Sequence, residues 1–161
     1  MEPWEELVET EKAYFACRMR LFAAGAKDQL ELALTDPRGR AAALRMLLAV
    51  PVDLTMELVE DVFEASIGLT DDIAIARDVL RRVDPGWLST ALRPLLANRF
   101  EEPKEPVDWV DYRCAADLLA DLNQNSLLSR FLIWAIRIDD PDVQEIVDDY
   151  RYVLENHPPQ P

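Results

Sequence analysis

The side chains best placed to do chemistry are carboxylates spaced along one stretch of the sequence. Glu57, Asp61 and Glu64 follow one another at positions i, i+4 and i+7, with Glu60 beside them. On a helix this spacing places the carboxylates on one face. Close carboxylates can exchange a proton with a substrate or hold a hard metal ion. The same spacing is typical of a solvated helix face, or of an acidic stripe that meets a basic partner. Glu57, Asp61 and Glu64 are therefore candidate binding residues.

A denser acidic run lies near the end of the chain. It contains Asp139, Asp140, Asp142, Glu145, Asp148 and Asp149. The run lacks the glycine and the terminal glutamate that a calcium-binding loop carries at fixed positions. Most of these acids fall at the expected start of a helix, where the helix dipole stabilises negative charge. Asp140, Asp142 and Asp149 are candidate binding residues on a charged surface, and no metal is expected there.

Residues for covalent or cofactor chemistry are scarce. The single histidine, His157, lies in a proline-rich tail that would not hold a general base in place. Cys17 and Cys114 form no CxxC or Cys/His cluster, so we expect reduced, buried thiols and no zinc site. The four glycines are scattered singly, which excludes a P-loop or a dinucleotide-binding loop. The sequence therefore predicts no catalytic residue, no metal and no cofactor.

Four large aromatic residues divide into two groups by their sequence context. Trp134 and Tyr150 share helical spacing with aliphatic residues, which predicts core positions. Trp87 and Trp109 lie beside turns, where an aromatic side chain can stay exposed and anchor a partner. Trp87 and Trp109 therefore join the candidate binding residues.

The charge of the chain is strongly negative and unevenly distributed. The formal net charge is −14. Residues 1–52 hold 8 acids and 7 bases, residues 53–108 hold 13 and 6, and residues 109–161 hold 10 and 4. The last two-thirds of the chain therefore repels phosphate, which argues against nucleic acid as a ligand. The charge favours a basic protein partner, or else it serves solubility.

Three further features of the sequence predict where the protein works. No run approaches about 18 apolar residues, so we expect no membrane-spanning helix and no membrane partner. The first residues, Met-Glu-Pro-Trp-Glu-Glu, are acidic where a signal peptide begins with basic residues. Only three of the 17 basic residues are lysine, a usage that indicates a GC-rich bacterial genome. We expect a cytoplasmic, bacterial protein.

Apolar periodicity predicts an all-α chain of about nine helices. The expected helices span about 3–23, 26–34, 40–50, 54–67, 73–83, 87–100, 109–122, 126–138 and 143–153. Asp53 is the expected N-cap of the helix at 54–67, and Pro94 is an expected kink. No alternating β-branched run of useful length is present. We expect one domain over residues 1–157 and a frayed tail at 158–161.

The junctions between turn and helix recur along the chain. Acidic turns begin at residues 36, 71, 108 and 140, at spacings of 35, 37 and 32 residues. A period of this size is typical of a solenoid, in which stacked helical hairpins share a continuous core. The two best copies are Thr35-Asp-Pro-Arg38 followed by Ala41-Ala-Ala43, and Asp139-Asp-Pro-Asp-Val143 with its flanking helices.

These two segments resemble the HEAT repeats of the armadillo-like superhelices. In HEAT repeats an Asp-Pro-type turn joins two helices, and a Val-Arg pair opens the second. Here Gln144 replaces the arginine, and the middle repeats lack the Asp-Pro turn. The resemblance implies a right-handed superhelix of stacked antiparallel hairpins over about residues 26–155. It implies a scaffold that binds proteins, with no catalytic residue to carry over. A four-helix bundle is the structural alternative.

Three classes of function are compatible with these features. The first is a non-enzymatic interaction module that binds a basic protein, including an inhibitor or immunity protein of a nuclease toxin. The second is an enzyme on a HEAT-like scaffold, such as a DNA-lesion glycosylase or a bilin lyase. It would need a basic patch from Arg18, Arg20, Arg38, Arg40 and Arg45 in the nearly neutral first third. The third is a structural domain that self-associates.

Overall fold

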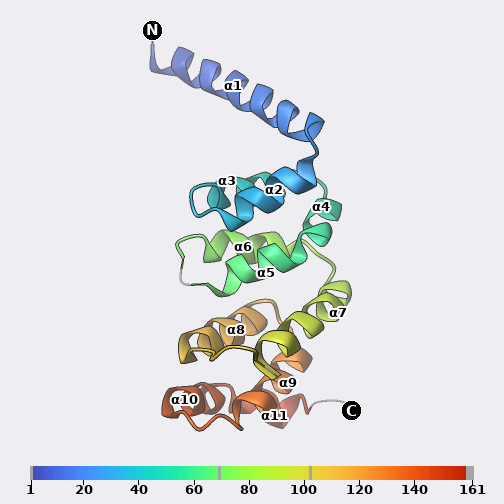
Figure 1. Cartoon of the computed structure of the whole chain (residues 1–161), viewed down its shortest axis with the longest axis vertical. Coiled ribbons are helices and arrows are strands. Elements are labelled where there is room, and N and C mark those ends of the chain that lie inside the picture. Colours follow the sequence, from blue (N-terminus) through green and yellow to red (C-terminus); the bar gives the residue numbers. More distant parts are fainter. Residues whose placement is uncertain (1, 69, 102, 159–161) are drawn as a thin grey trace.

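The regular structure of the described residues is entirely helical (Figure 1). The computed structural model describes residues 2–68, 70–101 and 103–158. The helices are α1 (Pro3–Ala23), α2 (Ala26–Thr35), α3 (Arg40–Leu48), α4 (Val52–Glu57), α5 (Val59–Ile67), α6 (Ile73–Arg81), α7 (Pro85–Leu96), a π-helical segment η1 (Ala97–Glu101), α8 (Trp109–Asp121), α9 (Asn125–Ala135), α10 (Pro141–Asp149) and α11 (Arg151–Asn156). No strand occurs in the described ranges, and the prediction of an all-α chain is confirmed.

The helices form pairs that are stacked along the long axis of the molecule. α2 packs on α3, α5 on α6 and α8 on α9. Each pair also contacts the next one: α2 meets α5, α3 meets α6, α5 meets α8, α8 meets α10, and α9 meets α11. Figure 1 shows these pairs as successive layers, with α4 and α7 at the side where the chain passes between layers. Stacking is required because a single helical pair cannot bury its own apolar stripe.

Three of the four largest fully buried side chains gather where η1, α8 and α9 meet. The ring centroid of Phe100 lies 5.0 Å from that of Tyr112 and 5.1 Å from that of Phe131. Tilted and edge-to-face contacts of this kind add to the free energy gained by burial. Trp134 is buried as predicted, whereas Tyr150 is only partly buried and donates its hydroxyl to Asp117 Oδ1 at 2.6 Å.

Two of the expected helices are interrupted, which raises the number of α-helices in the described ranges above the nine predicted. The helix expected at 54–67 begins earlier, at Val52, and divides at Leu58, whose φ of −110° and ψ of 20° are not helical. Asp53 is therefore inside α4 and is not an N-cap; Pro51 precedes the helix. Leu58 is fully buried, so packing at the break offsets the helical bonds lost there. The final helix divides similarly at Tyr150.

The irregularity expected at Pro94 takes the form of a change in helix type. Pro94 lies inside α7 and has no N–H to donate to the preceding turn. The π-helical turn η1 begins three residues later, at Ala97. α7 itself begins at Pro85, earlier than expected, because the carboxylate of Asp84 accepts the backbone N–H of Trp87 at 2.8 Å and caps the helix.

The first helix stands apart from the layers. α1 contains no buried residue, and Figure 1 shows it projecting from one end of the stack. It touches the stack through α2, through a 4.0 Å contact from Tyr14 Oη to Met46 Sδ, and through Arg18, whose Nη2 donates to the carbonyl of Ala49 at 3.2 Å. Gly25 joins α1 to α2 with a φ of 91°, a conformation that favours glycine.

The exposure of α1 overturns one expectation. Its apolar residues have helical spacing, but they face solvent because no other helix of the described residues covers them. Cys17, expected to be buried, is exposed on the same helix, whereas Cys114 is buried as predicted.

The C-terminal residues extend the last layer. The backbone N–H of His157 donates to the carbonyl of Val153 at 2.8 Å, so His157 ends α11. Of the tail expected to fray, residues 159–161 lie outside the described residues. Across the described ranges, every helix is too short or too polar to cross a membrane.

Candidate binding site on the acidic face

The carboxylates predicted to share one helix face are divided between two helices. Asp61 and Glu64 lie on α5 with Glu60, but Glu57 is the last residue of α4. The break at Leu58 therefore removes Glu57 from the face, and the expectation of a single stripe is wrong at that position.

A carboxylate from another helix takes the place of Glu57. Glu31 lies on α2, which packs on α5, and it acts electrostatically on Asp61 together with Glu60 and Glu64. We call Glu31, Glu60, Asp61 and Glu64 the acidic cluster. Burial raises the pKa of Asp61, and repulsion from the other three carboxylates raises it further. The folded structure therefore disfavours the charged form of Asp61, because the carboxylate is partly buried and lies close to three others.

Apolar residues buried between α2 and α5 hold the two helices, and with them the acidic cluster, in place. Leu30 and Leu34 are buried on α2, and Val62 and Phe63 are buried on α5. The apolar residues draw the two helices together, which leaves Glu31, next to Leu30, near the outer side of α5. Sequence reasoning missed Glu31 because 30 residues separate it from Asp61, and no local pattern links the two.

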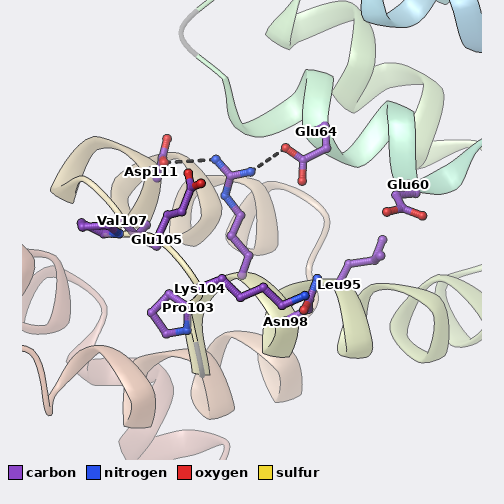
Figure 2. A pocket seen from close by; sticks show the side chains of 11 residues that line it. Glu60, Glu64, Leu95, Asn98, Pro103, Lys104, Glu105, Val107 and Asp111 are labelled. Carbon is purple, nitrogen blue, oxygen red and sulfur yellow. Dashed lines mark hydrogen bonds and ion pairs between the residues drawn. The ribbon is translucent and has the colours of Figure 1, made fainter.

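A polar pocket of about 450 Å³ adjoins the acidic cluster and shares two residues with it. Glu60 and Glu64 line one wall, and the chain between η1 and α8 lines another (Figure 2). The lining includes Asn98, Arg99, Lys104, Glu105, Val107 and Asp111. Four carboxylates and two basic groups face this space, so the pocket carries net negative charge.

Arg99 crosses the pocket and ties two layers together. Its Nη1 donates to Glu64 Oε2 at 2.6 Å, and its Nη2 donates to Asp111 Oδ2 at 3.1 Å (Figure 2). These charge-assisted contacts join α5, η1 and α8. The sequence gives no signal for this role, because Arg99 lies 35 positions from Glu64.

Other arginines also bind between elements of the stack. Arg77 and Arg81 reach Asp121 from α6, and Arg113 Nη1 reaches Asp149 Oδ2 at 2.7 Å. Arg82 donates to the carbonyls of Leu47 and Val50. The chain thus uses much of its positive charge internally.

The acidic cluster receives little of this positive charge. Glu64 pairs with Arg99, but within the described part of the chain no cationic group lies within ion-pair distance of Glu31, Glu60 or Asp61. Glu31 and Glu60 are exposed and Asp61 is partly buried, and none of the three has a counter-charge among the described residues.

The remaining candidate residues are not brought together with the cluster. Asp140 is the N-cap of α10 and accepts the N–H groups of Asp142 and Val143 at 2.8 and 3.3 Å. Asp142 is exposed in the first turn of α10, and Asp149 pairs with Arg113. α10 packs on α8, whereas the acidic cluster lies on α2 and α5.

The two tryptophans differ in exposure. Trp87 is partly buried and packs against the core, so the expectation that its side chain stays exposed is wrong, and its part in binding stays a prediction. Trp109 begins α8 and is 42% exposed, which leaves it accessible to a partner.

The described residues contain no group of three or more His, Cys, Asp or Glu side chains able to hold a metal ion. Burial raises the pKa of the Cys114 thiol, which disfavours the reactive thiolate. His157 lies against Asn125 at 3.3 Å, on the last layer. Comparisons with protein families, with curated proteins and with solved structures find no match to this chain.

Proposed function

We propose that the chain is a non-enzymatic scaffold that binds a basic protein through the acidic cluster. The observation that carries the proposal is the concentration of four carboxylates from α2 and α5, three of which have no cation within ion-pair distance among the described residues. Mutual repulsion at Asp61 is relieved when an arginine or lysine of a partner approaches. The carboxylates of the acidic cluster therefore gain, from the basic side chains of the partner, ion pairs that they lack in the free protein.

The stacking of the helices supports a HEAT-like architecture for this scaffold. The acidic turns at 36, 71, 108 and 140 precede α3, α6, α8 and α10. α3 packs on α6, α6 is tied to α8 through Arg77 and Arg81, and α8 packs on α10. Repeating turns that open stacked helices are typical of helical solenoids. We include the right-handed superhelix of HEAT repeats in the proposal.

The polarity of the site favours a protein partner over a small molecule or a nucleic acid. Small-molecule pockets are mostly apolar, whereas charged groups line much of the pocket beside the cluster. Phosphate would be repelled by Glu31, Glu60 and Asp61, none of which has a cation within ion-pair distance in the described part of the chain. Within this class we favour an inhibitor or immunity-type protein, because such proteins neutralise a basic partner by covering it with negative charge.

Affinity capture with three baits tests the proposal. The baits are the wild-type chain, the cluster variant Glu31→Gln/Glu60→Gln/Asp61→Asn, and the control variant Asp139→Asn/Asp142→Asn/Glu145→Gln. Each variant removes three negative charges, so the net charge of both changes from −14 to −11. Capture is made from a bacterial lysate at about 50 mM salt, where charge attraction is little screened.

We expect a basic protein that the wild-type and control baits retain and the cluster variant loses. Three lost charge contacts of about 0.5–1 kcal/mol each weaken binding roughly tenfold to a hundredfold. Rising salt should release the protein from the wild-type bait. Equal retention by all three baits, or retention that salt does not change, would contradict the proposal.

A further inference from the structure

The exposed face of α1 is the largest apolar feature that the proposed function does not use. Six large side chains lie along one side of the helix and are exposed: Trp4, Leu7, Val8, Phe15, Met19 and Phe22. We call this set the apolar stripe of α1. Their spacing follows the helical period, so they lie on one side of the helix, in two apolar segments (residues 4–8 and 15–22) with Glu11 between them. Tyr14 borders the stripe on the side that contacts Met46.

The stripe is large enough to form an interface. Its three aromatic residues are between 39% and 65% exposed. At about 200 Å² for each aromatic side chain, they leave about 300 Å² open to solvent. Leu7 and Met19, each more than two-thirds exposed, extend the patch to the size of the largest apolar patch on a typical monomeric protein, which is often functional. Two such stripes facing each other would bury on the order of 1,200 Å², the lower end of standard interfaces.

The charges of α1 are arranged so that the helix complements itself in the antiparallel direction. Its first half carries Glu5, Glu6, Glu9 and Glu11 together with Lys12, and its second half carries Arg18 and Arg20. Glu11 and Arg18 are seven residues apart, so both lie on the side of the apolar stripe. When two copies of α1 run antiparallel, the acidic half of each faces the basic half of the other.

We propose that α1 pairs with α1 of a second copy of the chain, antiparallel, about a twofold axis between Tyr14 and Phe15. In this register Glu11 of each copy faces Arg18 of the other, and Leu7 faces Phe22. Arg18 uses its Nη2 for the carbonyl of Ala49 and has further N–H groups to donate. The pair supplies the helix that α1 lacks in its own layer, since the layers of the stack are pairs of helices.

Two observations favour a second copy over other occupants. The polar side of α1 carries Glu5, Glu6 and Glu9, whereas helices that lie on a membrane surface carry lysine and arginine there. Four acids and three bases leave α1 nearly neutral, so two copies repel each other less here than along the rest of the chain.

Sedimentation equilibrium from about 1 to 200 µM tests the pairing. The wild-type chain is compared with variants in which the charges at positions 11 and 18 are reversed singly or exchanged. We expect the mass to rise from 18.4 kDa towards twice that value with concentration. Glu11→Arg and Arg18→Glu should each weaken association at least tenfold, because each places like charges opposite one another twice. The double variant Glu11→Arg/Arg18→Glu should restore association. Rescue can arise only between copies, because two helical turns separate the residues within one helix.

Two further variants separate this interface from other causes. Glu6→Arg makes the same charge change on the opposite side of α1 and should leave association unchanged. Phe15→Ser/Met19→Ser should abolish association without lowering the melting temperature at 1 µM, because both side chains are already exposed. A monomer at every concentration, or a dimer that tolerates the Phe15→Ser/Met19→Ser change, would overturn the proposal. Charge reversals that the double variant does not rescue would also overturn it. The acidic-cluster capture is independent of each of these outcomes.

Discussion

Removing Arg99 should show that burial, more than contact distance, sets the strength of the ion pairs that hold the layers together. Arg99 lies 2.6 Å from Glu64 and 3.1 Å from Asp111. The side chain of Glu64 is 50% exposed, and that of Asp111 is 30% exposed. If both pairs lay in a medium of the same dielectric constant, the shorter Arg99–Glu64 contact would be stronger by about a fifth. The effective dielectric near a protein surface varies by about fourfold between water and a half-buried site, so the effect of burial is larger.

The expected magnitudes follow from these exposures. Arg99→Met, which keeps the apolar stem of the side chain, should lower the free energy of unfolding by about 1–2 kcal/mol. In double-mutant cycles with Asp111→Asn and Glu64→Gln, the coupling to Asp111 should be about 1 kcal/mol, and that to Glu64 about 0.5 kcal/mol. A loss of 1 kcal/mol corresponds to a fall of about 2–4 °C in melting temperature for a chain of this size.

Urea unfolding followed by circular dichroism and by tryptophan fluorescence measures these values, and coincident transitions confirm two-state behaviour. In 1 M salt, where the screening length is about 3 Å, the coupling to Glu64 should fall more than that to Asp111. Arg38→Met is the matched control: Arg38 also pairs with an aspartate, Asp36, at 2.7 Å, but is 91% exposed. Its effect on the free energy of unfolding should be clearly smaller than that of Arg99→Met, because solvent screens the Arg38–Asp36 pair. A larger coupling to Glu64 than to Asp111, or an Arg99→Met variant as stable as wild type, would refute the reasoning.

Three further predictions concern the core and the ionisable groups. Phe131→Ala should cost about 3–5 kcal/mol in urea unfolding because it empties the centre of the aromatic cluster; a loss below 1 kcal/mol would place the core elsewhere. Burial and the hydrogen bond to Asp117 raise the pKa of Tyr150, so the folded state favours the neutral phenol. Stability that is present below about pH 10 should therefore fall as the pH rises above 10, and Tyr150→Phe should flatten this fall in a series of urea midpoints. The pKa of Asp61 is also raised, here because burial and neighbouring carboxylates disfavour its charge. Asp61→Asn should therefore stabilise the fold at pH 7 by roughly 0.5 kcal/mol, and the advantage should vanish below about pH 4; a destabilised variant at pH 7 would contradict the assigned repulsion.

The local elements of this protein could be predicted well because their causes are local. Helical hydrogen bonds and caps join residues within about four positions, so apolar spacing and turn residues carry most of the signal. The acidic turns at 108 and 140 correctly marked helix starts: Asp108 accepts the N–H of Val110 at 3.2 Å, and Asp140 accepts that of Asp142 at 2.8 Å. The break at Leu58 was not predictable in the same way, because both halves keep the spacing of one longer helix.

The candidate site could be predicted only in part. Asp61 and Glu64 belong to one helix, so their spacing placed them together correctly. Glu31 and Arg99 reach the same region from α2 and η1, and only the packing of layers brings them there. Trp87 was misplaced because a position beside a turn does not reveal whether a neighbouring layer covers it.

By itself, the sequence determined that the chain is all-helical, where most helices begin, and that its charge is strongly negative. The tertiary structure decided which apolar faces are covered. α1 illustrates the difference: its sequence specifies an amphipathic helix, as the sequences of α5 and α6 do, but α5 and α6 bury their apolar faces in the stack, and α1 does not. Periodicity fixes which side of a helix is apolar, because that depends on residues within one turn or two. Whether another helix lies against that side depends on contacts between residues more than 30 positions apart, which no local pattern encodes.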